Sequence, residues 1–333
     1  MPPVAPFPPR ILVIIWAMTI LVCGSLAYDT IMVFPDQFRK HILPDQMHIL
    51  NVSFMVPEMR REFGGTGGNI AYNLRLLGDA PFLMATAGHD FAPYAQRLES
   101  LGLSARHVRI LEDQFTAQAF ITTDVDDNQI TAFHPGAMSH SHLNRVADAK
   151  GVRLGIVSPD GKQGMMEHAR DFGRAAIPFV LDPGQGLPMY SGEELLEMLV
   201  HAHALTVNDY EARIVEQKTG KGIAEIANIV SAVVVTRGAE GSTVHAGGRA
   251  IDVPAVKPSA VVDPTGCGDA YRGGLLHGMA RAWPWERSAR LASVMGSIKI
   301  AHRGGQNHRP SREDIANTYS QAFGENLWKE EMA

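Results

Sequence analysis

The sequence predicts an α/β protein in which helices pack on a largely parallel sheet. Short apolar runs alternate with helical patterns along most of the 333 residues, and this alternation is typical of a layered domain built from strand–helix–strand units. With 45% apolar and 20% charged residues, the chain can bury a substantial core, as one large domain or two modest ones. A few strand-like segments break the alternation and predict extra strands outside the main sheet.

The strands of the main sheet are expected where short apolar runs are bounded by polar or turn-forming residues. These runs are 19–23, 82–87, 154–157, 179–181, 205–207 and 233–236. Candidate helices lie between them. One helix ends at Gly78, and its inward face carries Ile70, Leu74 and Leu77. The last helix begins at Ser311 with Asp314 in its first turn, and it packs through Ile315, Tyr319 and Phe323.

Two stretches have the pattern of hairpins rather than of strand–helix units. The first covers 30–54, and the second pairs 115–123 with 129–133 across the turn-forming sequence Asp-Asp-Asn at 126–128. Extra strands inserted into an α/β domain commonly cover a site. We therefore expect a small β-sheet lid formed by segments 30–56 and 115–134.

The apolar run 11–23 at the N-terminus permits two interpretations. It is similar to a signal peptide, because small residues follow it. Against this, a single basic residue precedes the run, prolines crowd 6–9, and the run is too short to span a bilayer as a helix. We favour a start at Met18, which makes 1–17 an extension and places the folded domain at 18–333.

Charge and cysteine usage narrow the range of partners. The net charge is −5 and no block of Lys or Arg is present, so we expect neither nucleic acid nor a membrane as partner. A small molecule is expected instead. The two cysteines, Cys23 and Cys267, lie in a strand-like run and a glycine turn, a usage that suits the reducing cytoplasm.

The most informative motif is the run Asp-Pro-Thr-Gly-Cys-Gly-Asp at 263–269. Val261 and Val262 precede it as the expected end of a strand, and apolar residues recur at helical intervals after it. A glycine-rich turn with free N–H groups at the start of a helix, beside a carboxylate, is suited to a phosphoryl group. The alternative is a tight turn with an aspartate as helix cap.

A second glycine-rich loop lies at 64–69, before the helix with Ile70. Gly64 and Gly65 allow close approach of the backbone to a ligand, and Asn69 offers both donors and acceptors. Together with Asp29, which follows the first strand, this loop is suited to a polyhydroxylated substrate. The simpler interpretation is a flexible helix entry, with Asp29 as a turn residue.

Two further loops follow strands and carry polar residues. Asn208 and Glu211 have the spacing of a helix capping box, and their oxygens are also suited to ordering magnesium and its waters around nucleotide phosphates. The turn at 236–241 closes the next strand and is suited to a phosphate contact. Neither a Walker-type P-loop nor a dinucleotide fingerprint is present.

Taken together and in order, these motifs resemble the ribokinase-like (PfkB) family of carbohydrate and purine kinases, over about 18–325. The segments that carry the resemblance are 24–29, 64–69, 208–211, 236–241 and 263–269. The closing motif departs from the family pattern, since Pro264 and Cys267 replace Thr and Ala. The segments 41–46, 130–138 and 299–308 are similar to bacterial nucleoside kinases related to adenosine kinase. The resemblance implies a three-layer α/β/α fold with a small β lid.

The same resemblance implies ATP-dependent phosphorylation of the ribose 5′-hydroxyl of a purine nucleoside, giving the nucleoside 5′-monophosphate and ADP. Adenosine is the first candidate, and inosine and guanosine are further ones. Asp269 would be the base, and the backbone N–H groups of Gly266, Cys267 and Gly268 would form an anion hole. The ribose would be held by Asp29, Gly64, Gly65 and Asn69. The base would stack on Phe133 or on another aromatic residue of the lid.

On the nucleotide side, the resemblance implies that Asn208 and Glu211 order Mg²⁺ through water. The ATP phosphates would be lined by Thr236, Gly238 and Gly241. The loop 302–308 would border the adenine and a monovalent cation such as K⁺, with Asp263 contributing to the cation region. A sugar kinase of the same family and a non-catalytic nucleoside-binding protein stay open as alternatives, as do a monomer and a homodimer.

Overall fold

The computed structural model describes residues 19–42, 51–126 and 128–328. Its main sheet has nine strands in the order β13-β12-β11-β10-β9-β8-β1-β4-β5, and all neighbours run parallel except the pairs that involve β12. The strands are β1 Thr19–Cys23, β4 Phe82–Gly88, β5 His107–Leu111, β8 Val152–Val157, β9 Phe179–Leu181, β10 Ala204–Asn208, β11 Ala232–Thr236, β12 Ser242–Ala246 and β13 Arg249–Val253.

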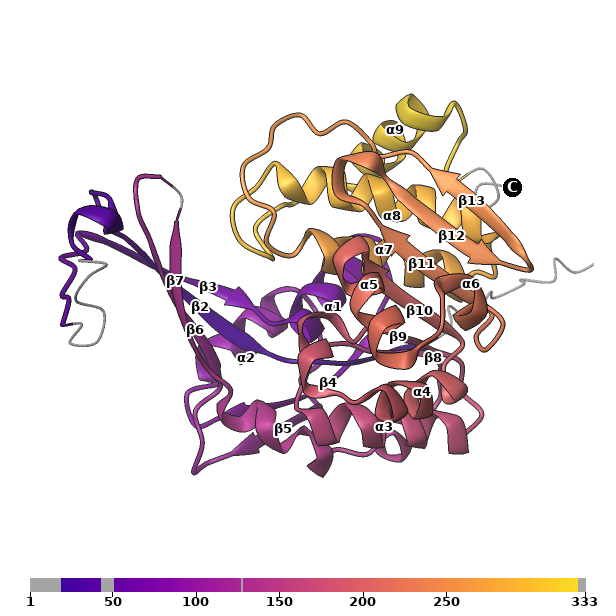
Figure 1. Ribbon diagram of the computed structural model, residues 1–333, viewed down its shortest axis with the longest axis horizontal. Helices are drawn as coiled ribbons and strands as arrows, with labels where there is room; N and C mark the ends of the chain where they lie inside the picture. Colours follow the sequence, from indigo (N-terminus) through magenta and orange to yellow (C-terminus); the bar gives the residue numbers. More distant parts are fainter. Residues whose placement is uncertain (1–18, 43–50, 127, 329–333) are drawn as a thin grey trace, which may run out of the picture.

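Helices cover both faces of this sheet, as Figure 1 shows. Alternate strand residues separate into two cores: Val22 and Ile156 face one layer of helices, and Leu21 and Val157 face the other. The first layer contains α1 Thr66–Leu76, α2 Ala92–Ser100, α7 Cys267–Ala280 and α8 Trp285–Ile300. The second contains α3 Lys162–Arg174, α4 Gly192–His201, α5 Asp209–Thr219 and α6 Ile223–Ile226. This arrangement confirms the three-layer α/β/α fold.

The six apolar runs predicted as strands of the main sheet are all strands in the structure, whereas the sequence pattern does not predict β5, β12 and β13. Strand β5 lies at an edge and is partly exposed, so its sequence lacks a strong apolar run. Strands β12 and β13 form a hairpin across Gly247 and Gly248, which both have positive φ. A Gly-Gly pair between two short alternating segments is a recognisable hairpin signal, and it would have identified this pair.

The last helix, α9 Arg312–Phe323, begins as predicted. Ser311 and Asp314 form a reciprocal capping box, which satisfies N–H groups that the first turn leaves free. Ile315 and Tyr319 are fully buried against α8. Within the described ranges, no helix combines the length and the apolar character needed to cross a membrane.

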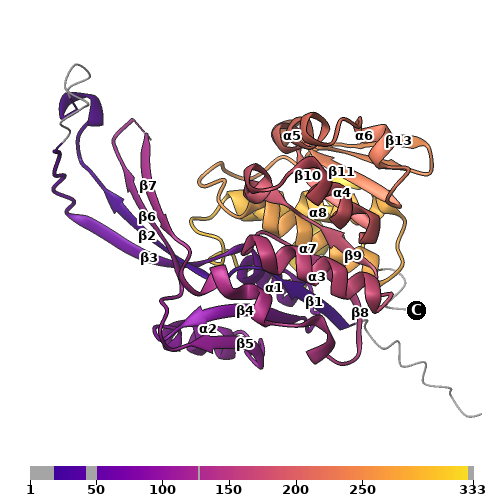
Figure 2. The same ribbon diagram turned by 60° about the horizontal axis from the view of Figure 1, so that its bottom comes forward.

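A second sheet, with four strands in the order β3-β2-β6-β7, leaves the main domain as an arm (Figures 1 and 2). Its strands are β2 Ala27–Val33, β3 Glu58–Gly64, β6 Ala117–Thr123 and β7 Gln129–His134. The expected hairpin at 30–54 is therefore wrong in its bounds, because β2 starts at Ala27 and its partner starts at Glu58. The charged residues of β3 conceal its strand pattern, since much of this strand is accessible to solvent. The strand predicted at 115–123 begins at Ala117.

Candidate active site

The two glycine-rich motifs meet through a hydrogen bond between distant parts of the chain. Asn69 in the first turn of α1 donates its Nδ2–H to Oδ2 of Asp269 in the first turn of α7, at 2.8 Å. The two helices pack side by side on the same face of the sheet. Gly266, at φ +76°, caps α7, and a Cβ there would lie 3.1 Å from the Cα of Gly305. The turn therefore fits closely only with glycine.

Asp269 is half-buried, and its surroundings set its acidity. Loss of hydration raises the pKa of Asp269 to about 6, while the hydrogen bond from Asn69 and the charge of Arg272 act in the opposite direction. The carboxylate of Asp29 is close enough to add to the increase. At neutral pH, Asp269 is ionised but is more basic than an ordinary aspartate.

The N–H groups of the turn are not equally free. The Cys267 N–H donates to the carbonyl of Pro264 at 3.1 Å. Within the described part of the chain, the N–H groups of Gly266 and Gly268 donate to no protein acceptor. The site is open to solvent at Gly268, which is exposed. Two donors at the N-terminus of α7 are thus available to an anion.

Asp29 reaches the same site from β2 of the second sheet. Burial, with the nearby carboxylates of Glu62 and Asp263, raises the pKa of Asp29 to about 6. A Cβ at position 64 would lie 2.4 Å from the Asp29 Oδ2, so Gly64 makes room for this carboxylate. Gly65, at φ +85°, packs against the carbonyl of Ser25 in the same way. The absence of side chains at Gly64 and Gly65 therefore leaves room for the Asp29 carboxylate and for the backbone at Ser25.

Side chains that the sequence did not single out fix the orientation of Asn69. Gln306 donates from Nε2 to the Asn69 Oδ1 at 3.2 Å and to the Tyr94 hydroxyl oxygen at 2.7 Å. Tyr94 donates in turn to the carbonyl of Gly64 at 2.8 Å. All three side chains are buried. Because its oxygen accepts from Gln306, the Asn69 amide must present its NH₂ group to Asp269.

A buried ion pair lies one turn further along α7. Arg272 donates from Nε and Nη2 to the two oxygens of Asp182, at 2.8 and 3.1 Å, and from Nη1 to the carbonyl of Gly268 at 3.2 Å. Burial raises the pKa of Asp269 and of Glu211, and the charge of Arg272 offsets part of this rise. Asp182 directly follows β9, and this position at the carboxyl end of a parallel strand is the only sequence signal for the pair.

Asn208 and Glu211 form the capping box of α5. The Asn208 Oδ1 accepts from the Glu211 N–H at 2.7 Å, and the Asn208 N–H donates to the Glu211 Oε2 at 2.8 Å. Burial raises the pKa of Glu211. In the described ranges, no three His, Cys, Asp or Glu side chains gather as a metal cage. The oxygens present instead suit Mg²⁺, which keeps several waters and binds through one or two carboxylates and substrate phosphates.

The turn at 236–241 lies beside Asn208. Thr236 at the end of β11 pairs in register with Asn208 and, on its other side, with Ser242. Ser242 shares a hydrogen bond of 2.8 Å with the Tyr271 hydroxyl of α7. Gly238 and Gly241 both have positive φ, and a Cβ at Gly238 would meet open space. The turn therefore lies at the same edge of the sheet as the start of α7.

The strand expected before the Asp263 motif is absent. Residues 254–265 form an irregular segment, in which Val261 is 75% exposed and Val262 is 47% exposed. Prolines at 254, 258 and 264 interrupt any ladder of hydrogen bonds. The Val262 N–H donates instead to the carbonyl of Ile300 at the end of α8, at 2.9 Å. The motif is thus anchored to α8.

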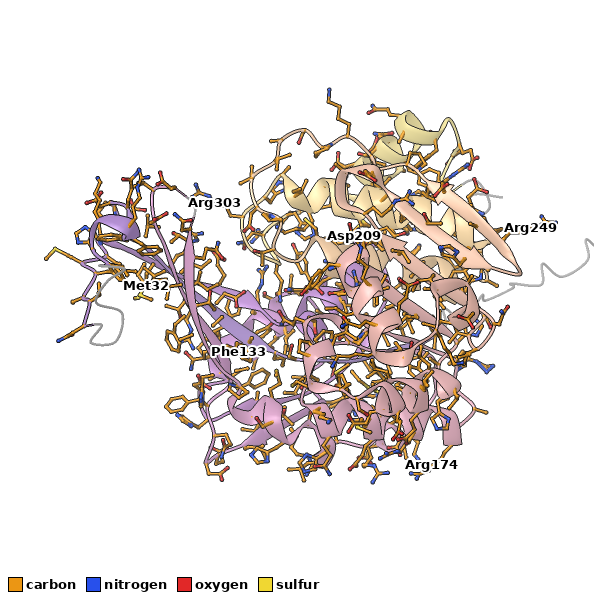
Figure 3. The ribbon with its side chains drawn as sticks, in the orientation of Figure 1. Met32, Phe133, Arg174, Asp209, Arg249 and Arg303 are labelled. Carbon is orange, nitrogen blue, oxygen red and sulfur yellow. The ribbon has the colours of Figure 1, made fainter. Side chains whose placement is uncertain are left out.

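Phe133, which the sequence assigns to the nucleoside base, lies on the second sheet and away from the glycine motifs. It is 48% exposed and lies on β7, near the end that joins the main domain (Figure 3). Its cross-strand partner is Ala119, which pairs in turn with Asp29. Directly paired residues project from the same face of a sheet. Phe133 therefore shares the face of Asp29, two strand spacings or about 10 Å away.

Comparison with known proteins decides the family, because residues 29–312 match the pfkB family of carbohydrate kinases. The chain belongs to this family. It is 30% identical to a nucleoside kinase of Methanocaldococcus jannaschii over 80% of this chain and 88% of that protein. A nucleoside kinase of Methanothermobacter thermautotrophicus is also 30% identical, over 92% and 96% of the two chains.

Solved structures agree with this assignment. The Burkholderia thailandensis nucleoside kinase in complex with inosine has a TM-score of 0.85 and 50% identity, and the match covers 92% of this chain and 99% of that one. The same enzyme with ADP and inosine is 51% identical, with a TM-score of 0.82. The family resemblance and the fold predicted from the sequence are confirmed, and a pfkB-family kinase uses ATP.

For this pfkB-family kinase we expect kcat/KM to fall as the pH falls below about 6, because Asp29 and Asp269 both become protonated near that pH. A pH profile of initial rates from pH 5 to 8 measures this. Their raised pKa values mean that the folded state binds more protons than the unfolded chain, so these carboxyls stabilise the fold as the pH falls. A constant kcat/KM down to pH 5 would contradict the assigned acidities. An unfolding midpoint that does not fall over this pH range would exclude acid unfolding as the cause of a loss in rate.

Proposed function

We propose that this kinase transfers the γ-phosphoryl group of ATP to the ribose 5′-hydroxyl of a purine nucleoside, giving the nucleoside 5′-monophosphate and ADP. The observation that carries the proposal is the Asn69–Asp269 hydrogen bond, which places an ionised carboxylate beside the free N–H groups at the start of α7. Relatives and neighbours named as nucleoside kinases support the acceptor class.

Asp269 is the base in this proposal. Its Oδ2 is engaged by Asn69, so Oδ1 is the oxygen that accepts the proton of the 5′-hydroxyl. Phosphoryl transfer passes through a loose transition state, in which the hydroxyl proton leaves late, and a modestly basic aspartate is therefore sufficient. The N–H groups of Gly266 and Gly268, with the positive end of α7, stabilise charge on the transferring group. Cys267 completes the turn.

Magnesium fits the nucleotide side of the site. Glu211 uses Oε2 in its capping box, and its other oxygen, with the side chain of Asn208, is the group that would orient waters on the ion. When bound, Mg²⁺ neutralises charge on the ATP phosphates. Thr236, Gly238 and Gly241 would line those phosphates, because their turn adjoins Asn208 at the same sheet edge.

The second sheet supplies the nucleoside side and acts as the lid. Asp29 accepts hydrogen bonds from the ribose hydroxyls, and Asn69, Gly64 and Gly65 form the floor beside it. Phe133 lies about 10 Å from Asp29 on the same face, a separation that a nucleoside bridges from its ribose to its base. An exposed aromatic ring at that place is suited to stacking on a purine.

The direct test incubates the protein with Mg-ATP and a panel of adenosine, inosine, guanosine, ribose and fructose. We expect nucleoside 5′-monophosphates as products, and Asp269→Asn should bind nucleoside with a similar Kd while losing at least a hundredfold in kcat, because the proton acceptor is gone. The amide keeps the shape of the side chain, and thermal unfolding checks that the variant is folded.

Two outcomes would reject the proposal. Phosphorylation of ribose or fructose with no nucleoside product would make the protein a sugar kinase. Nucleoside binding with no turnover of any acceptor would make it a binding protein. Full activity of Asp269→Asn would reject the assigned base and leave the acceptor class standing.

Phe133→Ala should raise the KM for inosine about tenfold and leave the KM for ATP unchanged, because stacking of a base on an aromatic ring contributes about 1–3 kcal/mol. The matched control is Ile130→Ala. Ile130 is also exposed on β7, but it lies three residues away and so projects from the opposite face. Equal effects of the two substitutions on the KM for inosine would contradict stacking on Phe133, because they would show that any change on β7 weakens inosine binding.

A further inference from the structure

Lys299 is a fully buried lysine that the proposed chemistry does not use. It lies in the last turn of α8, and its side chain is 0% exposed. The ammonium group donates to the carbonyl of Asp263 at 2.7 Å and to the carbonyl of His302 at 3.0 Å. A buried ammonium without partners is very costly, so these carbonyls and the charges around them must compensate for its lost hydration.

The surroundings of this ammonium are negative. The carboxylates of Asp263 and Asp269 favour its charged form, against the burial that lowers the pKa of Lys299. The C-terminal end of α8 adds the negative end of a helix dipole at the same place. This part of the structure therefore requires a cation, and Lys299 provides one from within the chain.

Asp263 connects this cation to the phosphoryl site. Its two carboxylate oxygens accept from the N–H groups of Thr265 and Gly304, both at 2.8 Å. Its carbonyl, which Lys299 holds, lies three residues before Gly266. The ammonium thus ties the turn 263–268 to the loop that follows α8, and it fixes where the N–H groups of Gly266 and Gly268 point.

The monovalent cation expected from the sequence at Asp263 and the loop 302–308 does not fit this arrangement. The ammonium occupies the position between the carbonyls of Asp263 and His302 that such an ion would need. K⁺ and an ammonium group have the same charge and a similar size, and both bind carbonyl oxygens. We propose that Lys299 is a tethered replacement for a monovalent cation and a positioning residue for phosphoryl transfer, so that the enzyme works without K⁺.

This inference rests on the proposed function for its activity readout, and thermal unfolding provides a second readout that does not. Three variants serve the test. Lys299→Ala removes the ammonium and leaves space for an ion, Lys299→Met keeps the stem but offers no charge, and Lys257→Ala removes an exposed lysine of the same 254–265 segment as a control. Each is assayed in choline chloride, LiCl, NaCl, NH₄Cl and KCl at equal ionic strength.

We expect the rate of the unaltered enzyme to change less than twofold among the salts, and Lys257→Ala to behave in the same way. In choline, Lys299→Ala should lose about a hundredfold in kcat with a smaller change in nucleoside KM, because a small displacement of the anion hole has that cost. K⁺ or NH₄⁺ should raise the kcat of Lys299→Ala at least tenfold above its value in choline, and Li⁺ should not. Lys299→Met should stay inactive in every salt. K⁺ should also raise the unfolding temperature of Lys299→Ala alone.

Activation of the unaltered enzyme more than tenfold by K⁺ would overturn the proposal, as would full activity of Lys299→Ala in choline. If Lys299→Ala loses activity and stability, and no cation restores either the rate or the unfolding temperature, Lys299 has a structural role only. That result would also overturn the proposal. If no acceptor is phosphorylated, the proposed function fails. In that case the unfolding temperature still tests the role of Lys299. A rise with K⁺ in Lys299→Ala, and not in the unaltered protein, would support the proposal that Lys299 replaces a monovalent cation.

Discussion

The hydrogen bond from Asn69 to Asp269 is the contact on which the site depends. It joins the first turns of α1 and α7, which are 200 positions apart in the chain. The carboxylate that we propose as the base at this place has to be dehydrated enough to be basic and yet remain ionised at neutral pH. Burial supplies the first condition, and the Asn69 N–H together with the Arg272 guanidinium supplies the second. The pKa near 6 is the balance between them.

The fold makes this contact possible because α1 and α7 pack on the same face of a parallel sheet. Their N-termini, the ends of β10 and β11, and the root of the second sheet all lie at one edge, where the carboxyl ends of the parallel strands are. Buried side chains behind the edge hold the geometry. Gln306 and Tyr94 orient Asn69. Arg272, which is paired with Asp182, donates to the carbonyl of Gly268 in the turn. Lys299 joins that turn to the end of α8.

The sequence predicted the elements that depend on local pattern. Apolar runs identified the central strands, and the glycine and carboxylate motifs singled out Asp29, Asn69 and Asp269, of which Asn69 and Asp269 share a hydrogen bond in the structure. It failed where long-range packing decides. The edge strand β5 has no strong pattern, and the valines before Asp263 predict a strand that three nearby prolines prevent. Tyr94 carries no motif, and Gln306 lies in the segment 299–308 without a role that its sequence assigns, because both side chains act through contacts with residues far away in the chain. Lys299 was likewise invisible as a cation, since its partners are backbone carbonyls.

The most direct measurement of the central claim is a titration of the Asp269 carboxyl by NMR, with aspartate labelled at the carboxyl carbon and the signal assigned by its absence in Asp269→Asn. We predict a pKa near 6 in the unaltered protein, and a higher value in Asn69→Leu, which removes the donor that favours the ionised form. A pKa near the ordinary value of about 4, or the same value in both proteins, would contradict the account.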